Sequence, residues 1–483
     1  MPTYSLKTQA AYLFLGKVIA FVLMAISPMI FVRLLNPLQF GTYRQIIFIM
    51  QLAVALIALR IPGSLYYFFP RKSSEIGQLI SQTLTLLGTA GCIGSAFFLV
   101  LGLVFHVLPS GVTEDYVLPV AVYLFIETVA CLVDHIFILE KKPKLVLAAT
   151  AGNSVIRLFL ILGAAILFHA VLAIVYALVL LSLLRLLTIM VYLVRKHTIR
   201  PGVFDRVLLR EQIKYTAPLA VSNTLDVIGS RIDRGIISGY MSPEDFAVYS
   251  IGGLGVMSAV MMLYTSIGKV CLPRFGELAV KGNLEGVRHL WHKMIVMNTM
   301  ATIPIVCFFC ALAVEIITIL FTEKYVAAAN IWRINMAVLI IKMLGFGHIP
   351  TALGKTGAIL AGNGVRFIMA VPLSIVLIMK LGLLGGAISF VLGFWANALI
   401  QLIAVKKALG ATIPTLLPWT RMARIFVISA IPALFLPYLS RLGTHNISTV
   451  LIGALVYFPV VGLALILTGS INVEELKGFF RKA

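Results

Sequence analysis

The sequence predicts an all-α membrane protein that crosses the bilayer many times. Three observations lead to this fold class. Hydrophobic residues make up 60% of the 483 residues, apolar runs follow one another from end to end, and short phrases recur about two hundred residues apart. A spanning helix needs about 20 mostly apolar residues, and backbone polar groups in lipid must be paired within the segment, so such runs form helices. We expect about fourteen transmembrane helices.

The apolar runs place these helices in order along the chain. The first run has no small-residue cleavage site followed by a soluble domain, so it is interpreted as a membrane span and not as a signal peptide. The fifth and sixth runs are separated only by Phe168-His169-Ala170. The fourteen expected segments are 9–32, 44–66, 79–107, 117–139, 145–168, 171–194, 212–237, 246–270, 293–320, 326–349, 354–379, 383–405, 422–440 and 447–469.

The recurring phrases indicate an internal duplication. Residues 37–43 and 243–249 both have the pattern Pro-x-x-Phe-x-x-Tyr, and each stands between two apolar runs. Phrases that recur in register predict a repeated unit, here of six helices. An even unit returns the chain to the same side, so the two copies have parallel topology about an axis along the membrane normal. The two other recurring phrases are Pro70-Arg71 with Pro273-Arg274, and Ala151-Gly152-Asn153 with Ala361-Gly362-Asn363.

The duplication predicts three parts. Residues 1–197 form an N-terminal six-helix lobe, residues 198–410 form a C-terminal six-helix lobe, and residues 411–483 add two further transmembrane helices. In duplicated membrane proteins of this kind the binding site lies between the halves. A substrate passage between the two lobes is therefore expected.

The charge distribution predicts the orientation and the partners. The net charge of +21 would suggest nucleic acid for a soluble chain, but here the basic residues lie in short loops and in a few helix interiors. A membrane surface and an anionic substrate explain this better, and no nucleic-acid partner is expected. Basic loops such as residues 141–144 and 195–214 lie on one side, and acidic pairs at 114–115 and 244–245 lie on the other. Both termini are therefore predicted to be cytoplasmic.

Charged and amide side chains inside the predicted spans are candidates for a substrate-binding cavity. Each charge in a span costs about 2.5–3.5 kcal/mol on insertion scales, so it should face a cavity or a partner. A guanidinium suits phosphate through paired hydrogen bonds and an ammonium supplies a point charge, so a pyrophosphate group fits such a cavity. The candidates are Lys17, Arg60, Asn153, Arg157, Asn223, Lys342, Asn363 and Arg366.

The acidic residues of the spans are fewer and have two interpretations. Glu127 and Asp134 are seven residues apart on one helix face, and so are Asp226 and Asp233. They either balance the buried cations or carry a proton or sodium ion that couples transport to a gradient. All four are candidates for ion coupling, and the sequence does not decide between the two roles.

Structural explanations of the same residues remain open. Arg231 and Arg234 can pair with the nearby acids or extend to the membrane interface. Arg60 can also extend to the interface. The glycines beside Asn153 and Asn363 can serve close helix packing.

No catalytic, metal or cofactor site is predicted. The chain lacks a Walker-type phosphate-binding loop, so ATP hydrolysis is not expected. Cys307 and Cys310 have metal-like spacing but no second pair or histidine nearby, and His289 and His292 flank a surface-type segment. The cysteines are interpreted as lipid-facing residues of a span, and the histidines, at a cytoplasmic helix start, as part of an interaction surface.

Two stretches resemble a known family. Residues 32–43, Val-Arg-Leu-Leu-Asn-Pro-Leu-Gln-Phe-Gly-Thr-Tyr, are similar to the start of the Wzx-type polysaccharide-biosynthesis flippases. Residues 233–240, Asp-Arg-Gly-Ile-Ile-Ser-Gly-Tyr, are similar to the seventh helix of that family. The family belongs to the multidrug/oligosaccharidyl-lipid/polysaccharide exporter superfamily, and the resemblance extends over nearly the whole chain.

The resemblance implies a function. Such proteins move undecaprenyl-pyrophosphate-linked oligosaccharides across the bacterial inner membrane by alternating access, for O-antigen, capsule or exopolysaccharide synthesis. Partners would be this substrate, membrane lipids, and a polysaccharide polymerase and glycosyltransferases. One alternative is a cation-coupled multidrug exporter of the same superfamily. Lys17 in the first helix departs from the acidic pattern expected of such exporters. Another is a membrane scaffold of a polysaccharide-assembly complex that transports nothing.

Overall fold

The structure, a computed structural model, describes residues 6–69, 76–196, 205–253, 256–355, 357–441 and 446–470. Within these ranges every regular element is a helix, which confirms the predicted all-α class. In the described part of the chain, ten helices are long and apolar enough to cross a membrane, and the longest of them breaks at Gly382. The number of fourteen crossings stays a prediction. The phrase Pro70-Arg71 lies outside the described residues.

The chain forms two compact units. One comprises residues 1–228 and 237–247, and the other comprises residues 229–236 and 248–483. The lobe boundaries predicted from the repeat, at 197/198 and 410/411, stay a prediction.

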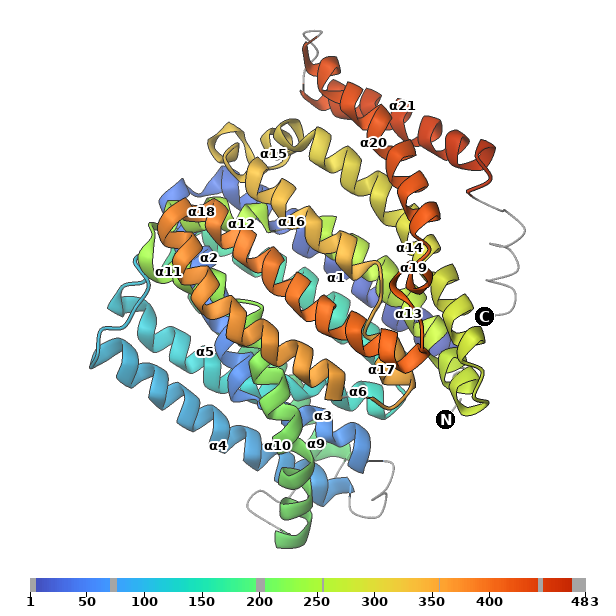
Figure 1. The fold of residues 1–483 in the computed structure, drawn as a ribbon. Helices are drawn as coiled ribbons and strands as arrows, with labels where there is room; N and C mark the ends of the chain where they lie inside the picture. The colour runs from blue at the N-terminus through green and yellow to red at the C-terminus, as the bar shows by residue number, and fades with distance from the viewer. Residues whose placement is uncertain are drawn as a thin grey trace. The chain divides into compact units, whose positions relative to one another are not determined.

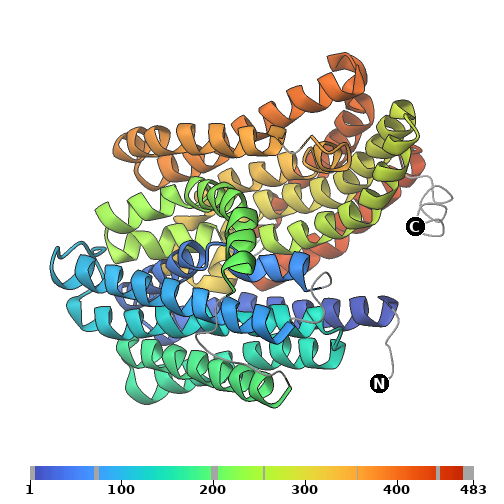
Figure 2. The ribbon, with the colours of Figure 1, turned by 90° about the horizontal axis from the view of Figure 1, so that it is seen from below.

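The first unit contains the helices of the first half of the chain. Within it α4 packs along α5, and α8 lies beside α9 (Figures 1 and 2). Its elements are α1 (Leu6–Leu34), α2 (Pro37–Ile57), α3 (Ile61–Phe68), α4 (Ile76–Leu103), η2 (Glu114–Tyr116), α5 (Val117–Ala130), α6 (Leu132–Leu139), α7 (Pro143–Leu147), the π-helical turn η3 (Ala148–Gly152), α8 (Asn153–Phe168), α9 (Val171–Lys196) and most of α10 (Arg206–Gly229).

The second unit contains the remaining helices, and α11 and α12 contribute residues to both units. Within it α14 packs on α20, and α16 packs on α18. The elements are α11 (Ile232–Tyr240), α12 (Pro243–Gly252), α13 (Val256–Val280), α14 (Leu284–Ala311), α15 (Ala313–Phe321), η4 (Glu323–Tyr325), α16 (Ala328–Lys342), α17 (His348–Ala352), α18 (Gly357–Leu409), α19 (Ile413–Leu416), α20 (Trp419–Arg441) and α21 (Asn446–Leu467).

The two copies of the Pro-x-x-Phe-x-x-Tyr phrase are helix starts. In the first copy the Asn36 side chain accepts a hydrogen bond from the Gln39 backbone N–H (2.8 Å), and Pro37 occupies the first helical turn of α2. In the second copy the Ser242 hydroxyl accepts from the Asp245 backbone N–H (3.1 Å) at the start of α12. A short polar cap followed by proline satisfies free N–H groups at a helix start, which explains why the phrase occurs between two helices.

Helix α10 is anchored to the first unit by buried polar and aromatic contacts. Gln212 is 1% exposed, and its amide donates to the hydroxyls of Ser64 (2.8 Å) and Thr83 (3.1 Å). One turn later Tyr215 stacks on Tyr67 with ring centroids 4.6 Å apart. Because buried amides must be hydrogen-bonded, these contacts fix the position of α10 on α3 and α4.

Candidate functional site

Two of the predicted cationic residues share one aromatic ring in the second unit. The Arg366 guanidinium carbon lies 3.8 Å from the centre of the Phe394 ring, and Lys342 Nζ lies 4.5 Å from the same centre. Arg366 is 4% exposed, and Lys342 is half-buried. Cations over an aromatic face are held by the quadrupole of the ring, so Phe394 brings a guanidinium and an ammonium together. Phe394 had not been predicted as the partner of either cation.

A row of side-chain amides lies beside this cluster. Asn397 donates through Nδ2 to Asn363 Oδ1 (2.8 Å), and Gln401 donates through Nε2 to Asn397 Oδ1 (2.5 Å). Asn363 and Arg366 are three residues apart and share a helix face, and the structure places Asn397 and Phe394 opposite them. The arrangement combines two cations with amide groups that can both donate and accept hydrogen bonds.

The break in α18 explains how these residues meet. Gly382 has φ 58°, a left-handed conformation that glycine adopts without strain, and the two halves of the helix form an antiparallel pair (Figure 1). At the turn, a Cβ on Gly385 would lie 2.0 Å from the Leu377 carbonyl oxygen, so only glycine fits there. Further along the pair, the buried hydroxyls of Ser374 and Ser389 are hydrogen-bonded (2.9 Å). This pairing aligns residues 394–401 with residues 363–366.

A second charged cluster lies in the first unit and includes two of the predicted acids. Arg185 of α9 donates through Nη1 to Glu127 Oε1 of α5 and through Nη2 to Asp134 Oδ2 of α6 (3.1 Å). The Ser182 hydroxyl donates to the other oxygen of Glu127 (2.8 Å). Glu127 on α5 and Asp134 on α6 therefore share one partner, an arginine that is absent from the candidates.

Asp233 is held inside the second unit by the tyrosine of the second repeated phrase. Its side chain is 2% exposed and accepts a hydrogen bond from the Tyr249 hydroxyl. Asp226 lies half-buried on α10, one element earlier. The two acids predicted to share a face thus fall on different helices, because α10 ends at Gly229 and α11 begins at Ile232.

The remaining candidates are dispersed. Lys17 is exposed on α1, next to Gly16, where an added Cβ would lie 3.3 Å from Leu147 Cδ1 and 3.5 Å from Thr150 Cβ. Arg60 is exposed at the start of α3 with φ 58°. Asn223 is half-buried on α10.

Asn153 and Arg157 occupy the first turns of α8, directly after the π-helical turn η3, and both are half-buried. The Asn153 Oδ1 atom is shielded from solvent, and no hydrogen bond to it is found within the described residues. The predicted role of both residues in substrate binding stays a prediction.

A polar cluster joins the turn between α6 and α7 to the end of α9. Lys142 donates to the Tyr192 hydroxyl (2.6 Å), and the buried Glu140 carboxylate accepts from Tyr192 and Lys196. The hydrogen bond to Tyr192 raises the pKa of the Lys142 ammonium above its ordinary value. Lys142 therefore keeps its charge at neutral pH.

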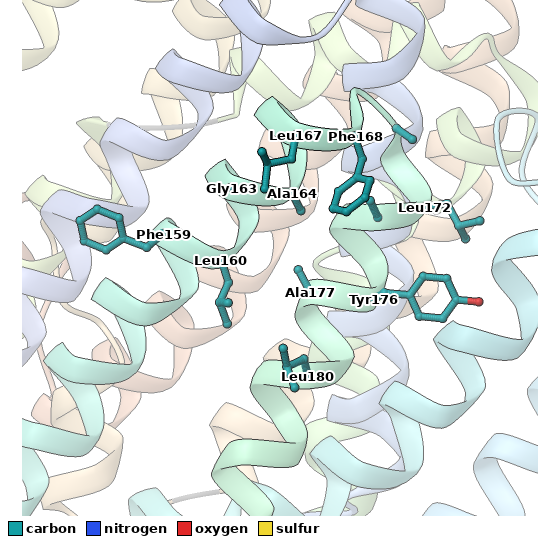
Figure 3. A pocket seen from close by; sticks show the side chains of 12 residues that line it. Phe159, Leu160, Gly163, Ala164, Leu167, Phe168, Leu172, Tyr176, Ala177 and Leu180 are labelled. Carbon is teal, nitrogen blue, oxygen red and sulfur yellow. The ribbon is translucent and has the colours of Figure 1, made fainter.

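An apolar groove of about 840 Å³ lies between α8 and α9 (Figure 3). Phe159 and Leu160 line it from α8, and Tyr176 and Leu180 line it from α9. None of its lining residues is charged. The groove suits hydrocarbon and contributes nothing to the recognition of a polar group.

The residues that sequence reasoning missed are Arg185, Phe394 and Asn397. Arg185 carried a usable signal, because an arginine in the middle of the apolar run 171–194 needs a partner. Asn397 carried the same signal as Asn363, an amide inside an apolar run, whereas Phe394 carried none, since an aromatic residue is ordinary in such a helix.

A family model and a curated relative match the sequence. A family model described as polysaccharide biosynthesis protein matches residues 30–330. An uncharacterised membrane protein of Methanocaldococcus jannaschii is 23% identical over 287 residues, which cover 58% of this chain and 55% of that protein. The chain thus matches about half the length of this curated relative.

Solved structures with the same fold are transporters. Lipid II flippase MurJ in an inward closed conformation aligns with a TM-score of 0.76 and 15% identity, covering 94% of this chain and 98% of that one. A MOP superfamily transporter from Pyrococcus furiosus aligns with a TM-score of 0.53 and 16% identity, covering 84% and 96%. A multidrug resistance MATE family transporter in an outward-facing conformation aligns with a TM-score of 0.51 and 15% identity, with the same coverage. At these identities the likeness shows the fold.

Proposed function

The chain belongs to the polysaccharide biosynthesis protein family, and we propose that it is a flippase for undecaprenyl-pyrophosphate-linked oligosaccharide in the bacterial inner membrane. The proposed orientation places both termini in the cytoplasm. The lipid tail stays in the bilayer while the pyrophosphate and sugar cross by alternating access. The product enters O-antigen, capsule or exopolysaccharide synthesis, with a polymerase and glycosyltransferases as partners.

The observation that carries this proposal is the pair of cations on Phe394. A pyrophosphate group has several negative oxygens, and it is recognised by a planar guanidinium together with a mobile ammonium. Arg366 and Lys342 supply this pair in the second unit. The neighbouring amides of Asn363, Asn397 and Gln401 are suited to sugar hydroxyls. Lys17, Arg60, Arg157, Asn153 and Asn223 are proposed as further contacts along the path.

The acidic residues do not favour the multidrug-exporter alternative. An exporter of cationic drugs needs carboxylates that are available to the drug or to a coupling ion. Glu127 and Asp134 instead share the guanidinium of Arg185, and Asp233 accepts from Tyr249. The scaffold alternative makes no use of the buried cations, and it is separated from the proposal by a transport measurement.

The test is translocation in sealed vesicles that contain the purified full chain. A radiolabelled lipid-linked oligosaccharide and, separately, a fluorescent cationic drug are presented on one side, with protein-free vesicles as the blank. The proposal predicts that the oligosaccharide crosses and the drug does not. Transport of the drug alone would establish the exporter, and transport of neither would favour the scaffold.

A further inference from the structure

Arg185 is shared by two carboxylates that come from different helices. Its Nη1 donates to Glu127 Oε1 on α5, and its Nη2 donates to Asp134 Oδ2 on α6 at 3.1 Å. α5 ends at Ala130 and α6 begins at Leu132, so the guanidinium bridges the break between them. Ser182, one turn before Arg185 on α9, adds a third contact by donating to Glu127 Oε2 (2.8 Å).

The burial of this cluster requires a positive charge. The Glu127 side chain is 13% exposed and that of Arg185 is 17% exposed, whereas Asp134 is 51% exposed. A buried carboxylate without a counter-charge is strongly destabilising, while Asp134 can keep part of its hydration. The guanidinium meets the requirement permanently, because arginine is not deprotonated in proteins.

The same oxygens form the kind of set that binds a metal cation. Two carboxylates and a hydroxyl from three helices resemble the hard oxygen ligands that small metal cations prefer. In this chain the Arg185 guanidinium nitrogens occupy the position between the carboxylates where such an ion would sit. The guanidinium is part of the chain and cannot dissociate from the site. It therefore cannot couple transport to a cation gradient across the membrane.

We propose that Arg185 is a built-in counter-cation that takes the place of an exchangeable sodium or potassium ion at Glu127 and Asp134. The inference deepens the proposed function, because it makes any transport by this chain independent of metal-cation binding at these two acids. Arg185 is a positioning residue that fixes α5, α6 and α9 together. Removing its charge should convert the acidic pair into a cation site.

The experiment measures the thermal unfolding midpoint of the full chain in lipid nanodiscs. Sodium chloride and potassium chloride are each exchanged for choline chloride at constant ionic strength. The variants are Arg185→Gln, Arg185→Lys, the double variant Glu127→Gln with Arg185→Gln, and the neutral triple variant Glu127→Gln, Asp134→Asn and Arg185→Gln. Wild type and the neutral triple variant are expected to respond equally to sodium and potassium.

Arg185→Gln should gain a response to sodium or potassium. Cation binding to the folded state raises the unfolding midpoint of this variant. The rise is about 1 °C for each tenfold increase in free cation concentration above the dissociation constant. The double variant should lose this gain, and Arg185→Lys should behave as wild type does.

Two results would overturn the inference: a larger cation response in wild type than in the neutral triple variant, or a folded Arg185→Gln variant without the gain. If Arg185→Gln does not fold in either salt, the comparison of wild type, Arg185→Lys and the triple variant decides. Because nothing is transported in this experiment, its failure would leave the proposed flippase function standing.

Discussion

Gly41 lies directly against the backbone of Pro243, so the two copies of the repeated phrase touch. A Cβ built on Gly41 would stand 1.9 Å from the Pro243 carbonyl oxygen, closer than any real contact. On the other side of Pro243, a Cβ on Gly111 would stand 2.6 Å from its Cγ. Residues 237–247 and 1–228 belong to the same compact unit, and these glycines are what allows the close approach.

Replacing Gly41 by alanine should therefore displace Pro243. Adding a methyl group to a filled contact costs about 1–3 kcal/mol, because the neighbouring backbone must move. The measurement is the thermal unfolding midpoint in nanodiscs. Gly63→Ala on α3 is the matched control, because open space surrounds a Cβ at that position. Equal midpoints for the two variants would show that the contact is not close in the folded protein.

The amide of Gln45 should be required for the same contact. Gln45 is fully buried, donates to the Ser238 carbonyl (3.1 Å) and accepts from the Gly111 N–H (3.2 Å). Leucine has a similar shape but leaves both backbone groups without this partner, at about 1–3 kcal/mol for each buried group. We expect Gln45→Leu to lower the unfolding midpoint and Gln51→Leu, exposed on the same helix, to leave it unchanged. An unchanged unfolding midpoint in Gln45→Leu would contradict these two hydrogen bonds.

The Phe394 ring should control anion binding through Arg366 and Lys342. Phe394→Leu removes two cation–π contacts of about 0.5–2 kcal/mol each, so inorganic pyrophosphate should bind about tenfold more weakly. Phe394→Tyr keeps the ring and should bind as wild type does. Binding is measured from the dependence of the unfolding midpoint on pyrophosphate concentration. A loss of affinity in Phe394→Tyr equal to that in Phe394→Leu would assign the ring a packing role only.

The predicted orientation can be checked by cysteine labelling. In a background without the five native cysteines, Asp115→Cys should react with a membrane-impermeant maleimide added to intact cells. Lys141→Cys should react only after the membrane is opened, because the positive-inside rule places its loop in the cytoplasm. Both positions are exposed, so access alone decides the labelling. The opposite pattern would invert the whole topology.

The helical fold was predictable because apolar runs in lipid have one structural solution. The helix starts at Pro37 and Pro243 were also readable, since a polar cap before proline is a local signal. The partners of the charged residues could not be predicted from the sequence. Arg185 lies 58 residues after Glu127, and Phe394 lies beyond a helix break from Arg366, so no periodicity connects them. Spacing predicted a shared face for Asp226 and Asp233, but the break after Gly229 separates them.

The most direct test of the account is the initial rate at which a lipid-linked oligosaccharide crosses vesicles containing the Lys17→Ala and Arg366→Ala double variant. Lys380→Ala, an exposed lysine on α18, serves as the control. The account predicts a fall of at least about tenfold for the double variant, because an arginine contact to phosphate contributes about 1.5–3 kcal/mol. The control should keep the wild-type rate. Unchanged translocation by the double variant would contradict recognition of the pyrophosphate by these cations.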